Sequence, residues 1–158
     1  LVVKSPDPHR VELDEIDKAI IRELQVDGRT PYAKLGPAVG LSQAAVRQRV
    51  QRLVERHAVQ VVAVTDPFVL GFGVMAMVGV ETDGPARPVA DALGAEPEVE
   101  YVVLTAGRYD LLVEVVCESH DDLLRLLDDR IRSVPGVRRA EPFTYLDITK
   151  QTYAWGTR

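Results

Sequence analysis

Residues 40–56 read GLSQAAVRQRVQRLVER, and this stretch decides the fold of the first part of the chain. Gly40 is expected to end one helix, because glycine readily adopts the left-handed conformation that closes a helix. Ser42 is a good N-cap for the next helix, which we expect to run to about Arg56. Apolar residues recur in it at i, i+4 and i+7, which predicts one buried stripe: Val46, Val50 and Leu53. Two helices joined by so short a turn indicate a helix-turn-helix.

The outward face of this expected helix carries amides and guanidinium groups and no carboxylate. At about 100° per residue from the inward stripe, the outward positions are Ala44, Gln48 and Gln51. Arg47 and Arg52 lie on the two shoulders of that face. Arginine pairs bidentately with guanine and glutamine with adenine. The alternative is an ordinary solvated face, but such faces usually mix charges of both signs. The composition therefore favours DNA recognition.

The expected DNA contacts divide into base readers and phosphate contacts. The full set is Ser42, Gln43, Arg47, Gln48, Gln51, Arg52 and Arg56. Those expected to face the major groove are Arg47, Gln48 and Gln51, whereas Ser42, Arg52 and Arg56 are expected nearer phosphates. Arg49 lies beside the buried stripe, and both a DNA contact and a pairing within the fold remain open for it.

Two further helices are expected upstream. The first has Asp14 as its N-cap and stops at Gly28, with apolar residues at i, i+4 and i+8: Ile16, Ile20 and Leu24. The second has Thr30 as its cap and Pro31 at the first helical position, and it ends at Gly40. Its expected buried residues are Leu35 and Val39.

Two local features modify this plan. Gly36-Pro37 falls inside the second helix, where a proline removes a backbone hydrogen bond at a cost of about 3 kcal/mol. We therefore expect this pair to affect the angle between the second and third helices. Residues 59–64 read VQVVAV, a β-branched run bounded by Asp66-Pro67, which predicts a strand serving as a wing or a connection.

The charge of the chain is distributed unevenly. A net charge of −5 argues at first against nucleic acid. Residues 28–65, however, hold six basic residues and one acidic residue, a balance of 6 − 1 = +5. Residues 67–158 hold nine basic and fifteen acidic residues, a balance of 9 − 15 = −6. Because affinity for phosphate depends on the local patch, the chain divides into a basic module and an acidic module.

The acidic module is expected to alternate strands and helices. The expected strands cover residues 74–81, 99–106, 109–117 and 137–148, and the expected helices cover 85–95 and the segment from Ser119 to Val134. This βαββαβ order predicts a ferredoxin-like sandwich with both helices on one face of the sheet. The other face is expected to be largely apolar and covered by a partner subunit, with dimer surfaces near Phe143, Tyr145 and Leu146.

The motifs of both modules resemble those of the Lrp/AsnC (leucine-responsive, or feast/famine) regulators. The resemblance spans about residues 12–150. It rests on residues 13–17, 27–29, 35, 40–42, 46–53, 107–112, 127, 134–137 and 150. It implies an α+β fold with a winged helix-turn-helix followed by a ligand-regulated βαββαβ domain. It also implies dimers that assemble to octamers, operator DNA, and amino-acid or related effectors. One departure is His57, where the family usually has glycine; histidine tolerates the left-handed conformation better than most residues.

The hairpin at residues 106–110 is the expected effector site. Gly107 lets the backbone approach a ligand or turn sharply, and Asp110 can hold the ammonium group of an amino acid. From the residues alone, a tight turn at Gly107 capped by Asp110 is the more common explanation. The resemblance favours effector binding here, between neighbouring dimers, with the remaining contacts from Thr105, Arg108 and Tyr109.

Motifs for other chemistry are missing from the sequence. His9, His57 and His120 have no partner at ligand spacing, so no metal, cofactor or catalytic site is expected, and Cys117 is expected to be an apolar filler. No apolar run approaches 18 residues, so we expect a cytoplasmic, nucleoid-associated protein without a membrane span. An architectural DNA-wrapping protein without an effector is the main alternative, and a small enzyme is disfavoured.

The expected domain boundaries follow from these elements. They are a tail at 1–11, a winged helix-turn-helix at 12–66, a linker at 67–72, an effector-binding and oligomerisation domain at 73–150, and a tail at 151–158.

Overall fold

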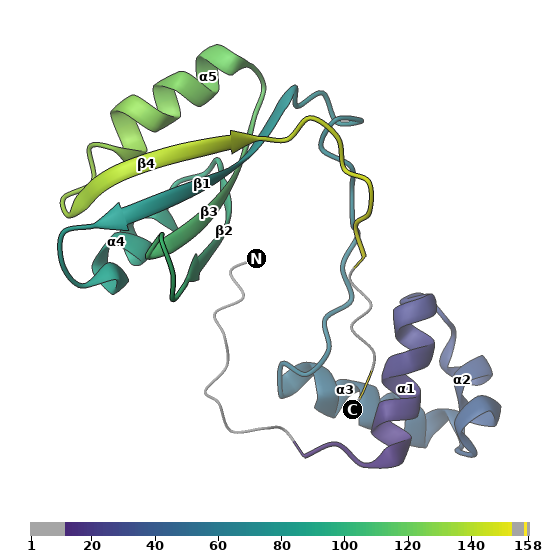
Figure 1. Ribbon diagram of the computed structural model, residues 1–158. Helices are drawn as coiled ribbons and strands as arrows, with labels where there is room; N and C mark the ends of the chain where they lie inside the picture. The colour runs from purple at the N-terminus through teal and green to yellow at the C-terminus, as the bar shows by residue number, and fades with distance from the viewer. Residues whose placement is uncertain (1–11, 153–156, 158) are drawn as a thin grey trace. The chain divides into compact units, whose positions relative to one another are not determined.

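The computed structural model describes residues 12–152 and residue 157 (Figure 1). Within these residues, one compact unit holds 12–64 together with 150–152 and 157, and a second unit holds 65–149. The expected tail at 1–11 and most of the expected tail at 151–158 lie outside the described residues. Among the described helices, none combines the length and the apolar composition that a membrane span requires.

The first unit is built from three helices: α1 (Glu15–Val26), α2 (Tyr32–Val39) and α3 (Gln43–Glu55). Both expected side-chain caps are present, because Asp14 accepts a hydrogen bond from the N–H of Asp17 and Ser42 accepts one from Ala45. The expected stripe of α3 packs against α1 and α2 in a small core: Ile20, Ile21, Leu35, Val46, Val50 and Leu53. His57 has φ 56°, so it adopts the left-handed conformation that its position requires.

The start of α2 differs from the expected one by a residue. Pro31 occupies the N-cap position and no side chain caps the helix, so the prediction of Thr30 as the cap was wrong. Two backbone N–H groups, those of Lys34 and Leu35, donate instead to the carbonyl of Pro31. Gly40 ends α2 with φ 71°, as expected for a left-handed C-cap.

The expected strand at residues 59–64 is absent. This segment has no regular structure, and Val61, Val62 and Val64 are exposed. A strand needs a neighbour that satisfies its backbone N–H and C=O groups, and no strand among the described residues pairs with this segment. Its β-branched composition therefore indicates a preference for extended backbone and does not by itself produce a strand or a wing.

The second unit is a four-stranded antiparallel sheet with helices. Its elements in chain order are β1 (Val74–Thr82), α4 (Ala86–Leu93), β2 (Val99–Leu104), β3 (Leu111–Cys117), α5 (His120–Arg125), η1 (Leu126–Ile131) and β4 (Val137–Thr144). The strand order is β2-β3-β1-β4, which is the order of a βαββαβ ferredoxin-like sandwich. Alternate residues of β1 and β3 pack against both helical segments in one core. The sheet and its helices are visible in Figure 1.

Two elements of this unit depart from expectation. The helix after Ser119 changes from α-helical to π-helical at Leu126, and its first turn is capped by Ser119 as expected. The last strand ends at Thr144 and not at Ile148: its register with β1 ends where Ala76 pairs with Thr144, and one further backbone bond joins Tyr145 to Met75 at 2.8 Å. The strands of the hairpin likewise stop short of residues 105–110.

The open face of the sheet is less apolar than expected. Met75, Met77 and Gly79 lie on this face, because the intervening residues of β1 belong to the core. Carboxylates lie among them and are paired: Glu114 accepts a 2.8 Å hydrogen bond from the hydroxyl of Tyr145. Burial, together with this bond, raises the pKa of Tyr145 well above its usual value. The face therefore combines apolar area with satisfied polar groups.

Candidate nucleic-acid interface and effector hairpin

The residues expected at the DNA lie on α3 and at its two ends, Ser42 as N-cap and Arg56 as C-cap. All seven are exposed: Ser42, Gln43, Arg47, Gln48, Gln51, Arg52 and Arg56. The stripe on the opposite side of the helix is buried, which fixes this face outward. One detail differs from expectation, because the amide of Gln51 donates a 2.9 Å hydrogen bond to Glu55. A carboxylate therefore lies beside this face in the last turn of the helix.

Arg49 pairs within the fold. Its Nη1 atom donates to Oδ2 of Asp14 at 2.6 Å and to Oδ1 of Asp17 at 2.7 Å. Of the two alternatives left open by the sequence, the intramolecular one holds. Arg52 also lies near this pair, with its Nη2 atom 3.7 Å from Oδ1 of Asp17, but its side chain is 45% exposed.

The charges at this contact stabilise one another. The N–H of Asp17 and the guanidinium of Arg49 lower the pKa of Asp14 below its ordinary 3.8. The hydrogen bonds to Asp14 and Asp17 raise the pKa of Arg49 above its ordinary value. Asp14 and Arg49 therefore each favour the charged form of the other. Sequence reasoning did not pair these residues, since 35 and 32 positions separate Arg49 from the two acids.

The groups at the expected effector hairpin already have partners in the chain. Thr105 donates from its hydroxyl to the carbonyl of Tyr109 at 2.5 Å. Asp110 accepts through Oδ2 from the backbone N–H of Thr82 at 2.7 Å and from its hydroxyl at 3.2 Å. Backbone bonds join Thr105 to Asp110 and Asp110 to Val80, both at 2.9 Å. The hairpin is thereby fixed to the end of β1.

Gly107 is not required by the turn itself. It is not among the glycines with positive φ, and a β-carbon built on it would meet no atom within 4 Å. Neither backbone conformation nor crowding within the chain explains a glycine at this position. The alternative explanation, a tight turn at Gly107, therefore does not account for the glycine. The other expectation stays a prediction: because Gly107 has no side chain, a ligand can approach the backbone of the turn.

Tyr109 lies flat over the open face of the sheet. A β-carbon on Gly79 would lie 2.8 Å from its ring, so the ring covers the backbone of β1 where that strand has no side chain. Phe143 packs edge-on against it with ring centroids 6.0 Å apart. The guanidinium of Arg108 lies 5.3 Å from the ring centroid.

Glu141 is a residue of this cluster that sequence reasoning missed. Its carboxylate accepts a hydrogen bond of 2.7 Å from the hydroxyl of Tyr109 and one of 3.0 Å from Arg139. The guanidinium of Arg108 lies 3.5 Å from the same carboxylate. The hydrogen bond from Tyr109 lowers the pKa of Glu141 and raises that of Tyr109. The available signal was Gly79 in a strand interior, which indicates close approach of another group. Its cross-strand partner is Glu141.

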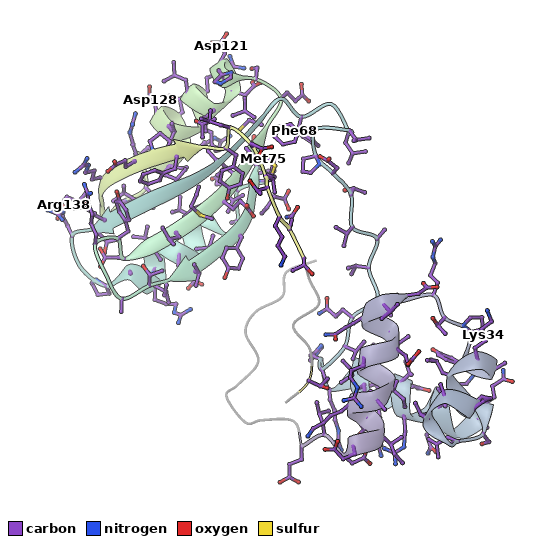
Figure 2. The ribbon with its side chains drawn as sticks, turned by 45° about the vertical axis from the view of Figure 1, so that its right-hand side comes forward. Lys34, Phe68, Met75, Asp121, Asp128 and Arg138 are labelled. Atoms are coloured by element: carbon purple, nitrogen blue, oxygen red, sulfur yellow. The ribbon has the colours of Figure 1, made fainter. Side chains whose placement is uncertain are left out.

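Other chemical groups are few in the described residues. No three histidine, cysteine or carboxylate side chains among them gather as a metal site would require. Cys117 is buried, and that burial raises the pKa of its thiol. His9 lies outside the described residues. Lys34 lies on α2 of the first unit, and Asp121 and Asp128 lie on the α5–η1 segment of the second (Figure 2).

Family models match both units of the chain. The AsnC-type helix-turn-helix domain matches residues 13–54, which include all of α1 and α2 and nearly all of α3. A C-terminal dimeric alpha+beta barrel domain of AsnC-type regulators matches residues 74–158. The first match lies within the first unit, and the second match begins at β1 of the second unit.

Named relatives and solved structures agree with the models. The HTH-type transcriptional regulator FL11 of Pyrococcus horikoshii is 34% identical over 145 residues, covering 90% of this chain and 95% of its own. The crystal structure of LrpA, the leucine response regulatory protein of Mycobacterium tuberculosis, matches with 33% identity, a TM-score of 0.79 and coverage of 88% and 96%. The regulator NMB0573 of Neisseria meningitidis, in complex with L-Met, matches with 26% identity, a TM-score of 0.80 and coverage of 90% and 95%.

A helix-turn-helix whose third helix presents an exposed basic face, followed by an α+β domain that matches the dimeric domain of AsnC-type regulators, defines a DNA-binding transcriptional regulator. The chain belongs to the Lrp/AsnC family of these regulators. The expected fold class and family are confirmed.

Proposed function

We propose that this regulator reads operator DNA with α3 and that an amino acid or related small metabolite controls its assembly or its DNA binding. The observation that carries the first half is the outward face of α3, where guanidinium and amide groups stand exposed. Arg47, Gln48 and Gln51 read bases, whereas Ser42, Arg52 and Arg56 lie nearer phosphates, with Gln43 at the same end as Ser42. The reading domain is 12–66, and it acts on nucleoid DNA in the cytoplasm.

The effector part of the proposal places the ligand at residues 105–110 in the domain 73–150. Thr82 fixes the carboxylate of Asp110 through Oδ2, so that carboxylate is already oriented to meet an ammonium group. The open space at Gly107 leaves the turn amides accessible to the ligand's carboxylate. Arg108 is 64% exposed and supplies a cation near the same turn. The relative NMB0573, solved with L-Met, supports an amino acid as the class of effector.

Assembly is the proposed link between the two sites. One α3 makes too few contacts for tight specificity, so a dimer is expected to read a pseudo-palindromic site. The open sheet face and the residues near Phe143, Tyr145 and Leu146 form the proposed dimer surface, and dimers assemble further, to octamers. A ligand held between subunits would bias that assembly and thereby the spacing of the reading helices.

The deciding experiment combines two measurements on the full chain. A thermal-shift screen with amino acids and 2-oxo acids is expected to identify a ligand that stabilises the protein. The protein is then tested for DNA selection from a random duplex library with and without that ligand. Selection of a sequence that changes in affinity or occupancy with the ligand supports the proposal. DNA binding without any stabilising ligand would favour an architectural DNA-wrapping protein instead.

A further inference from the structure

Three residues connect the start of α1 to the middle of α3. Asp14 precedes α1 and Asp17 lies in its first turn. Arg49 lies on α3, between the buried stripe and the outward face with Arg47, Gln48 and Gln51, which we call the reading face. One guanidinium nitrogen of Arg49 donates to both carboxylates, at 2.6 and 2.7 Å. The Arg49 side chain is 23% exposed and that of Asp17 is 8% exposed. The arginine is therefore held inside the unit and is not directed at the solvent.

One of the two carboxylates, that of Asp14, is fixed independently of Arg49. Oδ1 of Asp14 accepts the backbone N–H of Asp17 as the N-cap of α1, which leaves Oδ2 in a defined place. Both acids lie at a helix N-terminus, where the helix dipole favours negative charge. Because Asp17 is almost fully buried, its carboxylate requires a cationic or hydrogen-bonding partner. Arg49 therefore meets one acceptor that the helix cap fixes and a second, buried acceptor that needs a partner.

Directional contacts of this kind fix the rotation of a helix about its own axis, which apolar packing alone determines only approximately. The stripe of α3 sets which side of the helix faces inward, but hydrophobic burial is non-directional. Side-chain tips lie about 5–6 Å from a helix axis, so a rotation of 10° moves them by about 1 Å. Base reading depends on hydrogen bonds that tolerate less than that. Arg47 and Gln48 immediately precede Arg49 in the sequence, so the rotation of α3 places their side chains at the DNA.

We propose that Asp14, Asp17 and Arg49 form an anchor that fixes the rotation of α3, and that they are positioning residues for DNA recognition. The proposal rests on the reading role of α3 given above. None of the three touches DNA in this account. Arg49 acts through the placement of its neighbours, and the acids act through Arg49.

Asp17 has a second partner that extends the anchor toward the DNA. Nη2 of Arg52 lies 3.7 Å from the same Oδ1 atom that receives Arg49. The Arg52 side chain remains 45% exposed, so part of its guanidinium faces solvent. Asp17 thereby orients Arg52 on the shoulder of the reading face without removing it from contact with a phosphate.

For the preferred duplex, the anchor predicts a change in affinity opposite in sign to the change that charge alone predicts. Replacing an acid near the DNA adds positive charge, which on its own strengthens binding to any duplex. Loss of folded protein would weaken binding to all duplexes equally. A rotated α3 would instead lose base contacts while keeping its charge, so only binding to the preferred sequence weakens. The ratio of specific to non-specific affinity separates the three cases.

The test uses the full chain with Asp14→Ser and Asp17→Asn. Serine is as good an N-cap as aspartate, so Asp14→Ser keeps the cap of α1 and removes only the acceptor of Arg49. The matched control is Glu15→Gln, which removes a charge from the same turn, where Glu15 pairs with Lys18 at 2.7 Å on the surface. The probes are the duplex that the parent protein selects from a random library and a scrambled duplex of equal length.

The anchor variants are expected to lose about tenfold or more in affinity for the selected duplex, comparable to part of one bidentate base contact. Their affinity for the scrambled duplex should stay equal or rise, and Glu15→Gln should leave the ratio unchanged. Unchanged or tighter binding of the selected duplex by Asp14→Ser overturns the anchor, as does an equal loss on both duplexes. A parent protein that selects no sequence overturns the reading role of α3 itself, and the anchor with it.

Discussion

The α-carbon of Gly36 in α2 faces the carbonyl oxygen of Leu41 so closely that a β-carbon there would lie 2.6 Å from that oxygen. Leu41 belongs to the turn that leads into α3, and its N–H donates to the carbonyl of Gly36 at 2.8 Å. The glycine therefore allows the two helices of the helix-turn-helix to meet. Pro37, which follows it, is exposed and lies inside α2 without ending that helix.

Gly36→Ala is accordingly expected to destabilise the first unit by about 1–3 kcal/mol, because backbone must shift to admit the methyl group. Urea unfolding monitored by circular dichroism measures the change. Gly40→Asn is the control: a β-carbon at Gly40 meets nothing within 4 Å, and asparagine tolerates its positive φ, so we expect about 1 kcal/mol or less. Equal stability of Gly36→Ala and the parent protein would contradict the close approach.

Arg47 and Arg52 are expected to differ in what their removal does to DNA binding. Arg47→Ala should cost about 1–3 kcal/mol on the selected duplex and relax its sequence preference, because a base contact is lost. Arg52→Ala should weaken all duplexes alike and make the salt dependence shallower, because a phosphate contact is lost. Titrations at several salt concentrations separate the two. If Arg47→Ala and Gln51→Ala protect the same bases as the parent protein, another element reads the sequence.

The effector hairpin is tested with Gly107→Ala and Asp110→Ala. Space is open at Gly107, so its alanine variant should keep the fold of the parent chain while obstructing a ligand. Asp110→Ala removes the acceptor of Thr82 and must be compared with Asp110→Asn, which keeps an oxygen for that bond. Calorimetry with the amino acid found in the thermal screen is expected to show weakened binding in all three. Parental affinity in both Gly107→Ala and Asp110→Ala would place the pocket elsewhere.

The contact between Tyr109 and Glu141 should make stability depend on pH in a defined direction. The lowered pKa of Glu141 means that its contribution is present above its ordinary 4.5 and is lost as pH falls through the folded value. The raised pKa of Tyr109 means that its contribution is present below 10.0 and is lost as pH rises through the folded value. The stability difference between the parent protein and Tyr109→Phe should therefore shrink at both extremes. A difference in unfolding free energy that stays constant with pH would exclude this contact in solution.

The proposed dimer surface is tested most cleanly at Leu146. Its side chain is 98% exposed in the single chain, so Leu146→Glu removes no packing within the subunit. Light scattering at micromolar concentration is expected to show a dimer or larger assembly for the parent and a smaller mass for this variant. Leu124→Glu, at a 56% exposed position on α5, is the matched control and should leave the mass unchanged. A monomeric parent with full DNA affinity would refute the assembly.

Much of the fold could be predicted because its signals are local. The caps at Asp14, Ser42 and Ser119 lie within three residues of the groups they satisfy. The stripe of α3 follows helical periodicity, and the βαββαβ order follows from alternating patterns along the chain. The exposure of the reading face follows from the same periodicity, since a buried stripe on one side leaves the opposite side to solvent.

Only the tertiary structure decided which distant groups meet. The sequence alone left two roles open for Arg49, a DNA contact and a pairing within the fold. The two acids that it meets, Asp14 and Asp17, lie 35 and 32 residues away in the sequence. Glu141 joined the hairpin because the register of β4 with β1 places it opposite Gly79, where Tyr109 covers the strand. Residues 59–64 failed to form a strand because pairing needs a neighbour, and β-propensity supplies none. Local sequence determines caps and faces, whereas contacts between elements depend on register and packing over the whole chain.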